Sequence, residues 1–187
     1  DPERVSIGKI SKPTANVSQA VIQLPEREKY PALLGELEAR TGSAIIFVKT
    51  KIGAERLSLN LNKNNISSDA IHGNLRHSKR ERVIKAFHSK RFDVLVATDI
   101  AARGLDIPHI EHVINFDPPQ CPEDYVHRIG LTGRAGKKGS AISFITPKDH
   151  IIWRSIMRLL DPKKYSSPHF SKSSRKPRQH YGAKRKK

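Results

Sequence analysis

The sequence contains a single cysteine, Cys121, and no apolar run that approaches the ~20 residues needed to span a bilayer. One thiol cannot form an internal disulfide, and a cysteine-rich zinc site is excluded for the same reason. The first residues also lack the apolar core of a signal peptide. We therefore expect a protein with no membrane partner that works in a reducing compartment, cytoplasmic or, if the host has a nucleus, nuclear.

Acidic residues are scarce: 18 Asp and Glu stand against 35 Lys and Arg, which leaves a net charge of +17. Residues 162–187 hold ten Lys or Arg and no acid, so most of the excess belongs to this tail. An excess of positive charge favours a polyanionic partner. Tyr165, Phe170 and Tyr181 lie among these cations, a combination that suits single-stranded nucleic acid. A solubilising or targeting tail is the alternative.

The length of 187 residues suits one domain with short extensions. Residues 1–18 are polar and show no periodicity, so we interpret them as a linker from an upstream domain that this chain lacks. Residues 19–160 form the expected domain. Residues 161–187 combine Ser, Lys, Arg and Pro without apolar spacing, and a basic disordered tail is expected there because such a segment cannot offset its ordering entropy.

Apolar strands and amphipathic helices alternate along the expected domain. Continuous apolar strands of this kind predict an α/β fold, a parallel sheet covered by helices on both faces. In such sheets the ligand-binding residues lie on loops at the carboxyl ends of the strands. Strands are expected at 17–25, 43–48, 67–73, 92–98, 112–117 and 139–146, and helices at 26–42, 50–61, 78–89, 122–129 and 148–160.

Two of these loops carry hydroxyl, glycine and basic residues. Thr50 follows the second expected strand, where it can cap the next helix or hold a phosphate with the exposed helix amides. Gly73 permits a tight exit from the third strand. Basic residues then gather at a helix start, a poor place for cations unless an anion compensates, although a solvated charged face explains them equally well. These residues are Arg76, Lys79, Arg80 and Arg82.

Two further loops are more specific. Thr98, Arg103, Gly104 and Asp106 follow an apolar strand directly, and together they offer phosphate donors and an acceptor for sugar hydroxyls. The stretch from Glu123 to Gly139 then places His127, Arg128 and Arg134 around two glycines. A guanidinium offered from a loop is what phosphoryl transfer uses to stabilise charge in its transition state.

A complete nucleotide site also needs a cradle for the triphosphate and ligands for magnesium. The sequence contains no GxxxxGK[ST] motif, and no acidic pair follows a strand as magnesium ligands do. We therefore expect half of a nucleotide site, whose other half comes from another domain.

Four motifs in order now point to a family. The segments SAIIFVKTK, IHGNLRHSKRERVIKAF, VATDIAARGLDI and YVHRIGLTGRAG resemble motifs IV, IVa, V and VI of DEAD-box ATP-dependent RNA helicases. The resemblance covers about residues 18–160 and identifies the second, C-terminal RecA-like domain. It implies a three-layer RecA-like sheet of the P-loop NTPase type. It also implies that a first RecA-like domain of the same full-length chain holds the phosphate loop and Mg²⁺, with ATP and RNA bound across the cleft.

The resemblance assigns roles residue by residue. Asp106 would accept from the ATP ribose, and His127 would couple the ATP site to the RNA site. Arg128 and Arg134 would belong to the catalytic and ATP-binding set. No metal ligand is implied in this chain. The residues expected to grip the RNA backbone, without reading its sequence, are Thr50, Gly73, Thr98, Arg103 and Gly104.

Leu131 departs from the family pattern. The family's motif VI reads HRIGRTGR, and its second and third arginines act as arginine fingers; Leu131 stands in place of the second. Fingers contribute about 10³ to 10⁵ in rate, so hydrolysis is expected to be slowed while RNA binding persists. A natural slow variant, an engineered or erroneous substitution, and compensation by Lys137 or Lys138 all remain open.

Two functions from different classes follow. The first is the C-terminal half of an RNA-dependent ATPase and helicase, inactive alone and monomeric. The second is an RNA-binding clamp or scaffold with little or no ATP turnover, because leucine replaces a finger.

Overall fold

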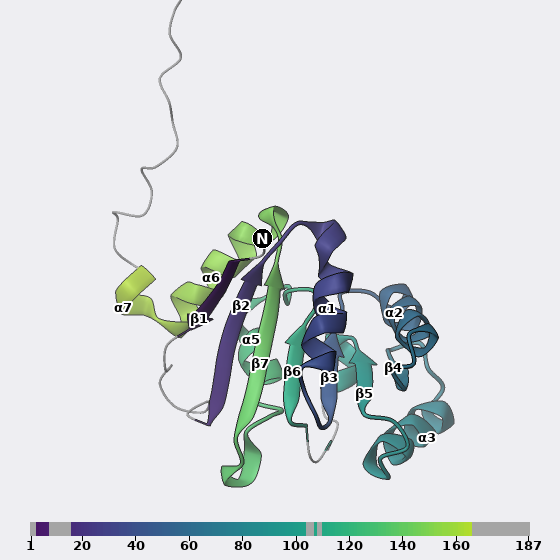
Figure 1. Ribbon diagram of the computed structural model, residues 1–187. Coiled ribbons are helices and arrows are strands. Elements are labelled where there is room, and N and C mark those ends of the chain that lie inside the picture. Colours follow the sequence, from purple (N-terminus) through teal and green to yellow (C-terminus); the bar gives the residue numbers. More distant parts are fainter. Residues whose placement is uncertain (1–2, 8–15, 104–106, 108–109, 166–187) are drawn as a thin grey trace, which may run out of the picture.

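The computed structural model describes residues 3–7, 16–103, 107 and 110–165, and a seven-stranded sheet runs through them in the order β1-β2-β7-β6-β3-β5-β4 (Figure 1). The six strands from β2 to β4 are parallel to their neighbours, and β1 pairs with β2 in the antiparallel sense. The strands are β1 (Glu3–Ile7), β2 (Val17–Gln23), β3 (Ala44–Phe47), β4 (Ser68–Ile71), β5 (Val94–Ala97), β6 (His112–Asn115) and β7 (Gly139–Ile145).

Helices cover both faces of this sheet. On one face, α1 (Lys29–Glu38) and α2 (Lys51–Lys63) bury residues such as Leu33 and Leu61. The other face is covered by α3 (His77–His88), α4 (Asp99–Ala102), α5 (Pro122–Ile129) and α6 (His150–Leu160). The predicted three-layer RecA-like α/β fold is thereby confirmed. The short elements are η1 (Glu26–Glu28), η2 (Arg134–Gly136), η3 (Pro147–Asp149) and α7 (Pro162–Tyr165).

The central strands explain why the sequence shows continuous apolar runs rather than alternation. In β3, Ile45 and Phe47 point into the core beneath α3 to α6, whereas Ala44 and Ile46 point into the core beneath α1 and α2. All four are buried because the sheet has a helical layer on each side. Each large side chain buried in this way contributes about 1.5–3 kcal/mol relative to its exposed state.

The structure differs from the sequence prediction at both ends of the domain. Residues Glu3–Ile7, expected within a linker, form β1, whereas β2 begins at Val17, where the first strand is expected. A strand of five residues is too short to give a clear period, and it is fixed by pairing along its own whole length with Gln19–Gln23 of β2. Pro162–Tyr165, expected as the start of the tail, form a helical turn whose Tyr165 packs against the core. The predicted tail from residue 166 onward, with Phe170 and Tyr181, lies outside the described residues.

Within the ranges that the structure describes, no helix combines the length and the apolar character needed to cross a membrane.

Candidate functional site

Three of the loops predicted to bind a ligand leave the sheet at one edge. β3, β5 and β4 are neighbours, and their last residues Phe47, Ala97 and Ile71 are paired in register. Thr50, Gly73 and Thr98 follow these strand ends within three residues. Since the carboxyl ends of parallel strands share one edge, the fold brings these three residues to the same side of the sheet.

These three residues differ in their contacts and in their exposure at this edge. The hydroxyl of Thr50 accepts a hydrogen bond from the backbone N–H of Gly53 at 3.0 Å and caps α2. Accepting leaves its own O–H free to donate, so capping and anion binding are compatible. Gly73 is exposed, and no atom lies within 4 Å of a Cβ built on it. Thr98 is buried, and its N–H donates to the carbonyl of Ile71 at 3.2 Å, which joins β5 to the end of β4.

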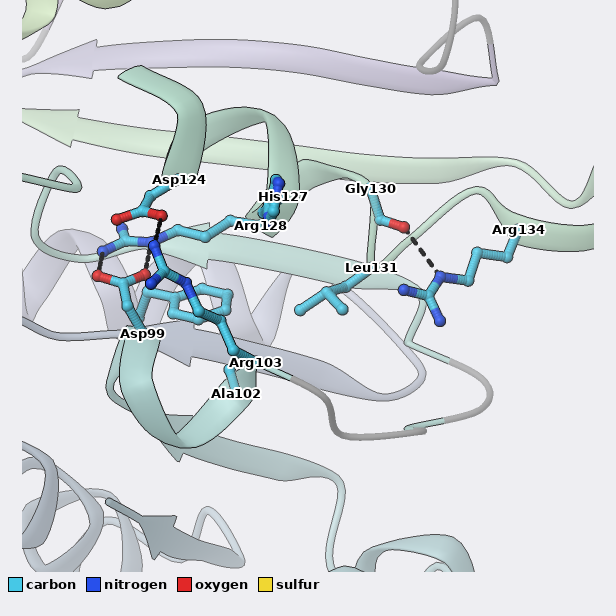
Figure 2. Close-up of a pocket in the computed structure, with 10 residues that line it drawn as sticks. Asp99, Ala102, Arg103, Asp124, His127, Arg128, Gly130, Leu131 and Arg134 are labelled. Atoms are coloured by element: carbon cyan, nitrogen blue, oxygen red, sulfur yellow. Dashed lines mark hydrogen bonds and ion pairs between the residues drawn. The ribbon is translucent and has the colours of Figure 1, made fainter. Parts of the chain in front are cut away.

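A pocket of about 550 Å³ lies beside this edge, between α4, α5 and the turn after α5 (Figure 2). It brings together four predicted site residues: Arg103, His127, Arg128 and Arg134. The edge residues Thr50, Gly73 and Thr98 do not line it. Its other lining residues are Phe47, Asp99, Ala102, Asp124, Gly130 and Leu131.

All three guanidinium nitrogens of Arg128 make hydrogen bonds within the protein. Its side chain is 2% exposed, and its Nε and Nη2 donate to the two carboxylate oxygens of Asp99 at 2.6 and 2.8 Å. Nη1 donates to Asn115 Oδ1 at 3.0 Å and to the Asp117 carbonyl at 2.7 Å, while the guanidinium lies 4.6 Å from the ring centroid of Phe47. This bidentate, stacked arrangement is specific to arginine. Arg128 therefore ties α5 to the start of α4 and to the end of β6.

The same network reaches α1 through Asp117. Its carboxylate lies 2.5 Å from Lys29 Nζ and accepts the N–H of Lys49 at 2.9 Å. Lys29 is 2% exposed and also lies 4.5 Å from the ring centroid of Phe116. A buried lysine requires such a partner, because an unpaired buried charge is costly.

Arg103, predicted to hold RNA, is paired within the pocket. Its guanidinium donates to Asp124 of α5, and this ion pair raises the pKa of Arg103 above its ordinary value. Burial acts to raise the pKa of Asp124, but hydrogen bonds from Cys121 and Arg103 and the charge of Arg128 together hold it below its ordinary value. Asp124 is thus a carboxylate that stays ionised between two arginines.

The opposite side of the pocket is formed by Leu131 and Arg134 (Figure 2). Arg134 is exposed, and its Nε donates to the carbonyl of Gly130 at 2.9 Å. Gly133 adopts φ +67°, and a Cβ there would lie 2.6 Å from Val17, so glycine is required for the turn that delivers Arg134. Leu131 packs partly against the core, and His127 is exposed on α5.

Comparison with known proteins places this arrangement in a family. Residues 28–136 match the model of the helicase conserved C-terminal domain. The DEAD-box ATP-dependent RNA helicase CshA of Bacillus subtilis is 43% identical over 157 residues, which is 83% of this chain and 32% of that protein. The chain belongs to the DEAD-box helicases. It spans about a third of the length of the curated relatives that it matches.

Solved DEAD-box structures agree with the fold. A DEAD box protein from the hyperthermophile Methanococcus jannaschii superposes with a TM-score of 0.75 at 41% identity, covering 80% of this chain and 41% of that chain. The C-terminal domain of the DEAD-box protein Dbp5 gives 0.68 at 38% identity, covering 74% of this chain and 81% of that domain.

Several site predictions for this DEAD-box domain stay predictions. Gly104 and Asp106 lie outside the described residues. Arg128, predicted in the catalytic set, makes internal contacts with all three of its guanidinium nitrogens. Lys137 and Lys138, named as substitutes for the missing finger, are exposed and do not line the pocket.

The sequence did not indicate the acidic and amide partners of these arginines. Asp124, Asn115, Asp117 and Lys29 were not recognised because their partners come from segments far away in the chain. Asp99 lies within motif V, but nothing in the sequence shows that it pairs with Arg128 29 residues later. The position of Asp124 four residues before Arg128 on the same predicted helix suggests the wrong ion pair, because Asp124 binds Arg103 and Arg128 binds Asp99.

Among the described residues, no group of three or more His, Cys, Asp or Glu could hold a metal ion. Magnesium prefers several oxygen ligands in near-octahedral geometry. The described part of this chain does not by itself fit the Mg²⁺ that accompanies ATP.

Proposed function

We propose that this chain is the C-terminal half of an ATP-dependent RNA helicase, which binds the RNA backbone at the strand-end edge and completes an ATP site with a preceding RecA-like domain. The name of CshA, an ATP-dependent RNA helicase, supports both ligands. Mg²⁺ would be held by the preceding domain, so the isolated chain would not hydrolyse ATP.

The observation that carries the RNA half of this proposal is the open edge beside Gly73. Thr50 offers a free O–H there, and the backbone at Gly73 is unobstructed. Unobstructed backbone and hydroxyl donors suit sugar–phosphate contacts, which carry affinity without reading sequence. Thr98 and Gly104 would extend the same surface, and Arg103 would join it once released from Asp124.

The variant Gly73→Glu tests the edge directly. The structure leaves room for a side chain at this position, so folding should be nearly unaffected, with a change within about 0.5 kcal/mol. A carboxylate there would repel the phosphates, and we expect binding of single-stranded RNA to fall at least tenfold in a fluorescence anisotropy titration. Gly35→Glu, on α1 and equally unobstructed, is the matched control. Equal affinity for both variants would disprove RNA binding at this edge.

The ATP half concerns Leu131 and Arg134. Arg134 is the exposed arginine of the pocket that retains a single backbone contact, so it is free to reach a phosphate. Leu131 supplies neither charge nor donor. We therefore propose that Arg134 acts as the remaining finger and that turnover is slow.

RNA-stimulated ATP hydrolysis by the chain joined to its preceding RecA-like domain tests this role. Leu131→Arg should raise the turnover number by about 10³ or more if a finger is missing. Rates that are equal and high in both proteins would contradict the missing finger. Lys137→Ala and Lys138→Ala in the original background would then show whether a lysine replaces it.

An RNA-binding clamp with little or no turnover remains the second candidate, and the leucine in the pocket favours it. Undetectable hydrolysis in the joined protein, together with RNA binding that Gly73→Glu abolishes, would support the clamp.

A further inference from the structure

A second basic surface lies away from the pocket, along the outer side of α3. A groove of about 640 Å³ runs between α3, β4 and the loop that follows α3. Figure 1 shows α3 beside β4, at the end of the sheet opposite β1. Four cations and one carboxylate line the groove: Lys79, Arg82, Lys85, Arg91 and Asp69.

These cations are not neutralised by the protein. All four are exposed, and in the part of the chain that the structure describes no ion pair involves them. Arg82 makes one long hydrogen bond of 3.4 Å to the carbonyl of Ser78 in its own helix. Asp69, the carboxylate of the groove, accepts from the neighbouring N–H of Ala70. The groove therefore carries a net positive field, with four cations against the single carboxylate of Asp69.

The position of the first cation adds to this imbalance. Lys79 lies in the first turn of α3, which contains no acid, and the helix dipole disfavours a cation there unless an anion is near. From Lys79 to Ser89 the groove follows the helix for about 15 Å. Its first lining residue on α3, Lys79, comes six residues after Gly73 in the sequence, on the helix that follows the proposed RNA edge.

We propose that this α3 groove binds the phosphate backbone of RNA that extends beyond the strand-end edge. The inference rests on the proposed RNA function of that edge and adds a second stretch of contact to it. Charge complementarity requires an anion, and the short chain connection from Gly73 to the first turn of α3 favours RNA bound at that edge over an acidic polypeptide. The contacts are electrostatic, so the groove contributes affinity and salt dependence and reads no sequence.

The test compares two double variants of equal charge change. Arg82→Gln with Lys85→Gln removes two groove cations and keeps good helix formers. Arg154→Gln with Arg158→Gln removes two exposed cations from α6, which covers the β1–β2 end of the sheet. Affinity for single-stranded poly(U) is measured against salt concentration. Two lost phosphate contacts should lower the slope of log K against log salt by about 1.4 for the groove pair and leave it unchanged for the α6 pair.

Three other results overturn the proposal. If the slope is unchanged for the groove pair while Gly73→Glu still loses binding, RNA contacts the strand-end edge and does not contact the groove. Equal reductions for both pairs show that overall charge alone is responsible. Loss of binding to polyglutamate with RNA binding intact assigns the groove to an acidic polypeptide. If Gly73→Glu also binds RNA normally, the proposed RNA function fails as well.

Discussion

The pocket beside α5 and the groove along α3 are both rich in arginine and lysine, but their charges are arranged in opposite ways. In the pocket, Arg128 and Arg103 are paired with Asp99 and Asp124. In the groove, Lys79, Arg82, Lys85 and Arg91 lack such partners among the residues that the structure places. Paired arginines hold loops in position and are not free for a ligand, whereas unpaired cations remain available to an anion. The number of basic residues near a site is therefore a poor guide to what binds there.

The largest expected effect comes from removing an arginine of the pocket that is paired with a carboxylate. Arg128→Met removes a buried arginine and leaves the partly buried Asp99 without its partner, and removal of one member of a buried pair costs up to about 3–5 kcal/mol. Arg82→Met in the groove should change the free energy of unfolding by no more than about 0.5 kcal/mol. Urea denaturation of the two variants measures the difference. Similar values for both would show that the internal ion pair does not stabilise the fold.

The second prediction concerns Tyr125, which lies on the same helix as Arg128 and becomes negatively charged as the pH rises. Tyr125 of α5 is fully buried, its hydroxyl donates to Gln19 Oε1 at 3.0 Å, and burial raises its pKa to about 12 from an ordinary 10.0. The stability tied to its neutral form is complete below pH 10 and is lost as the pH rises toward 12. A pKa that is higher by about two in the folded state corresponds to a loss of about 2–3 kcal/mol of folding stability over this pH range.

Thermal unfolding of Tyr125→Phe against pH isolates this contribution. The variant should lose about 1 kcal/mol at neutral pH through the missing hydrogen bond, and it should show a shallower fall between pH 10 and 12. Parallel curves for the two proteins in that range would exclude Tyr125 as the source.

The smallest effect is expected for the ion pair of the pocket that joins the exposed Arg103 to the buried Asp124. The pKa of Asp124 is held below its ordinary value of 3.8, so its contribution is complete above that pH and is lost as the pH falls further. Asp124→Asn should therefore cost at most about 1 kcal/mol at neutral pH, because Arg103 is 57% exposed, and it should flatten the acid limb of the stability curve.

The same substitution frees Arg103, and a modest gain in RNA affinity in the anisotropy assay would indicate that the ion pair competes with RNA. If the stability of Asp124→Asn falls at acid pH as steeply as that of the original protein, other carboxylates determine the loss of stability in acid.

The strands, the helices and the loops of this site follow from local sequence, but the partners of its charges do not. Apolar runs such as Ala44–Phe47 and the repeating helix pattern depend on neighbouring residues, so they can be read directly. Arg128 illustrates the limit, because its role depends on Asp99, Asn115 and Asp117, which only the parallel sheet brings together. Motif spacing points to Arg103, His127, Arg128 and Arg134, which line one pocket. It could not tell Arg128, which is used internally, from Arg134, which is exposed, because burial is a property of the folded chain.

The strand β1 has a consequence for how this domain behaves in concentrated solution. A parallel sheet leaves a row of unpaired N–H and C=O groups along its outermost strand, and such a row is a template for association with other chains. The antiparallel pairing of Glu3–Ile7 with Gln19–Gln23 occupies that row on β2. The five-residue β1 thus replaces the seven-residue β2 as the outermost strand, which leaves a shorter row open to association, and removing Glu3–Ile7 would expose Gln19–Gln23 again.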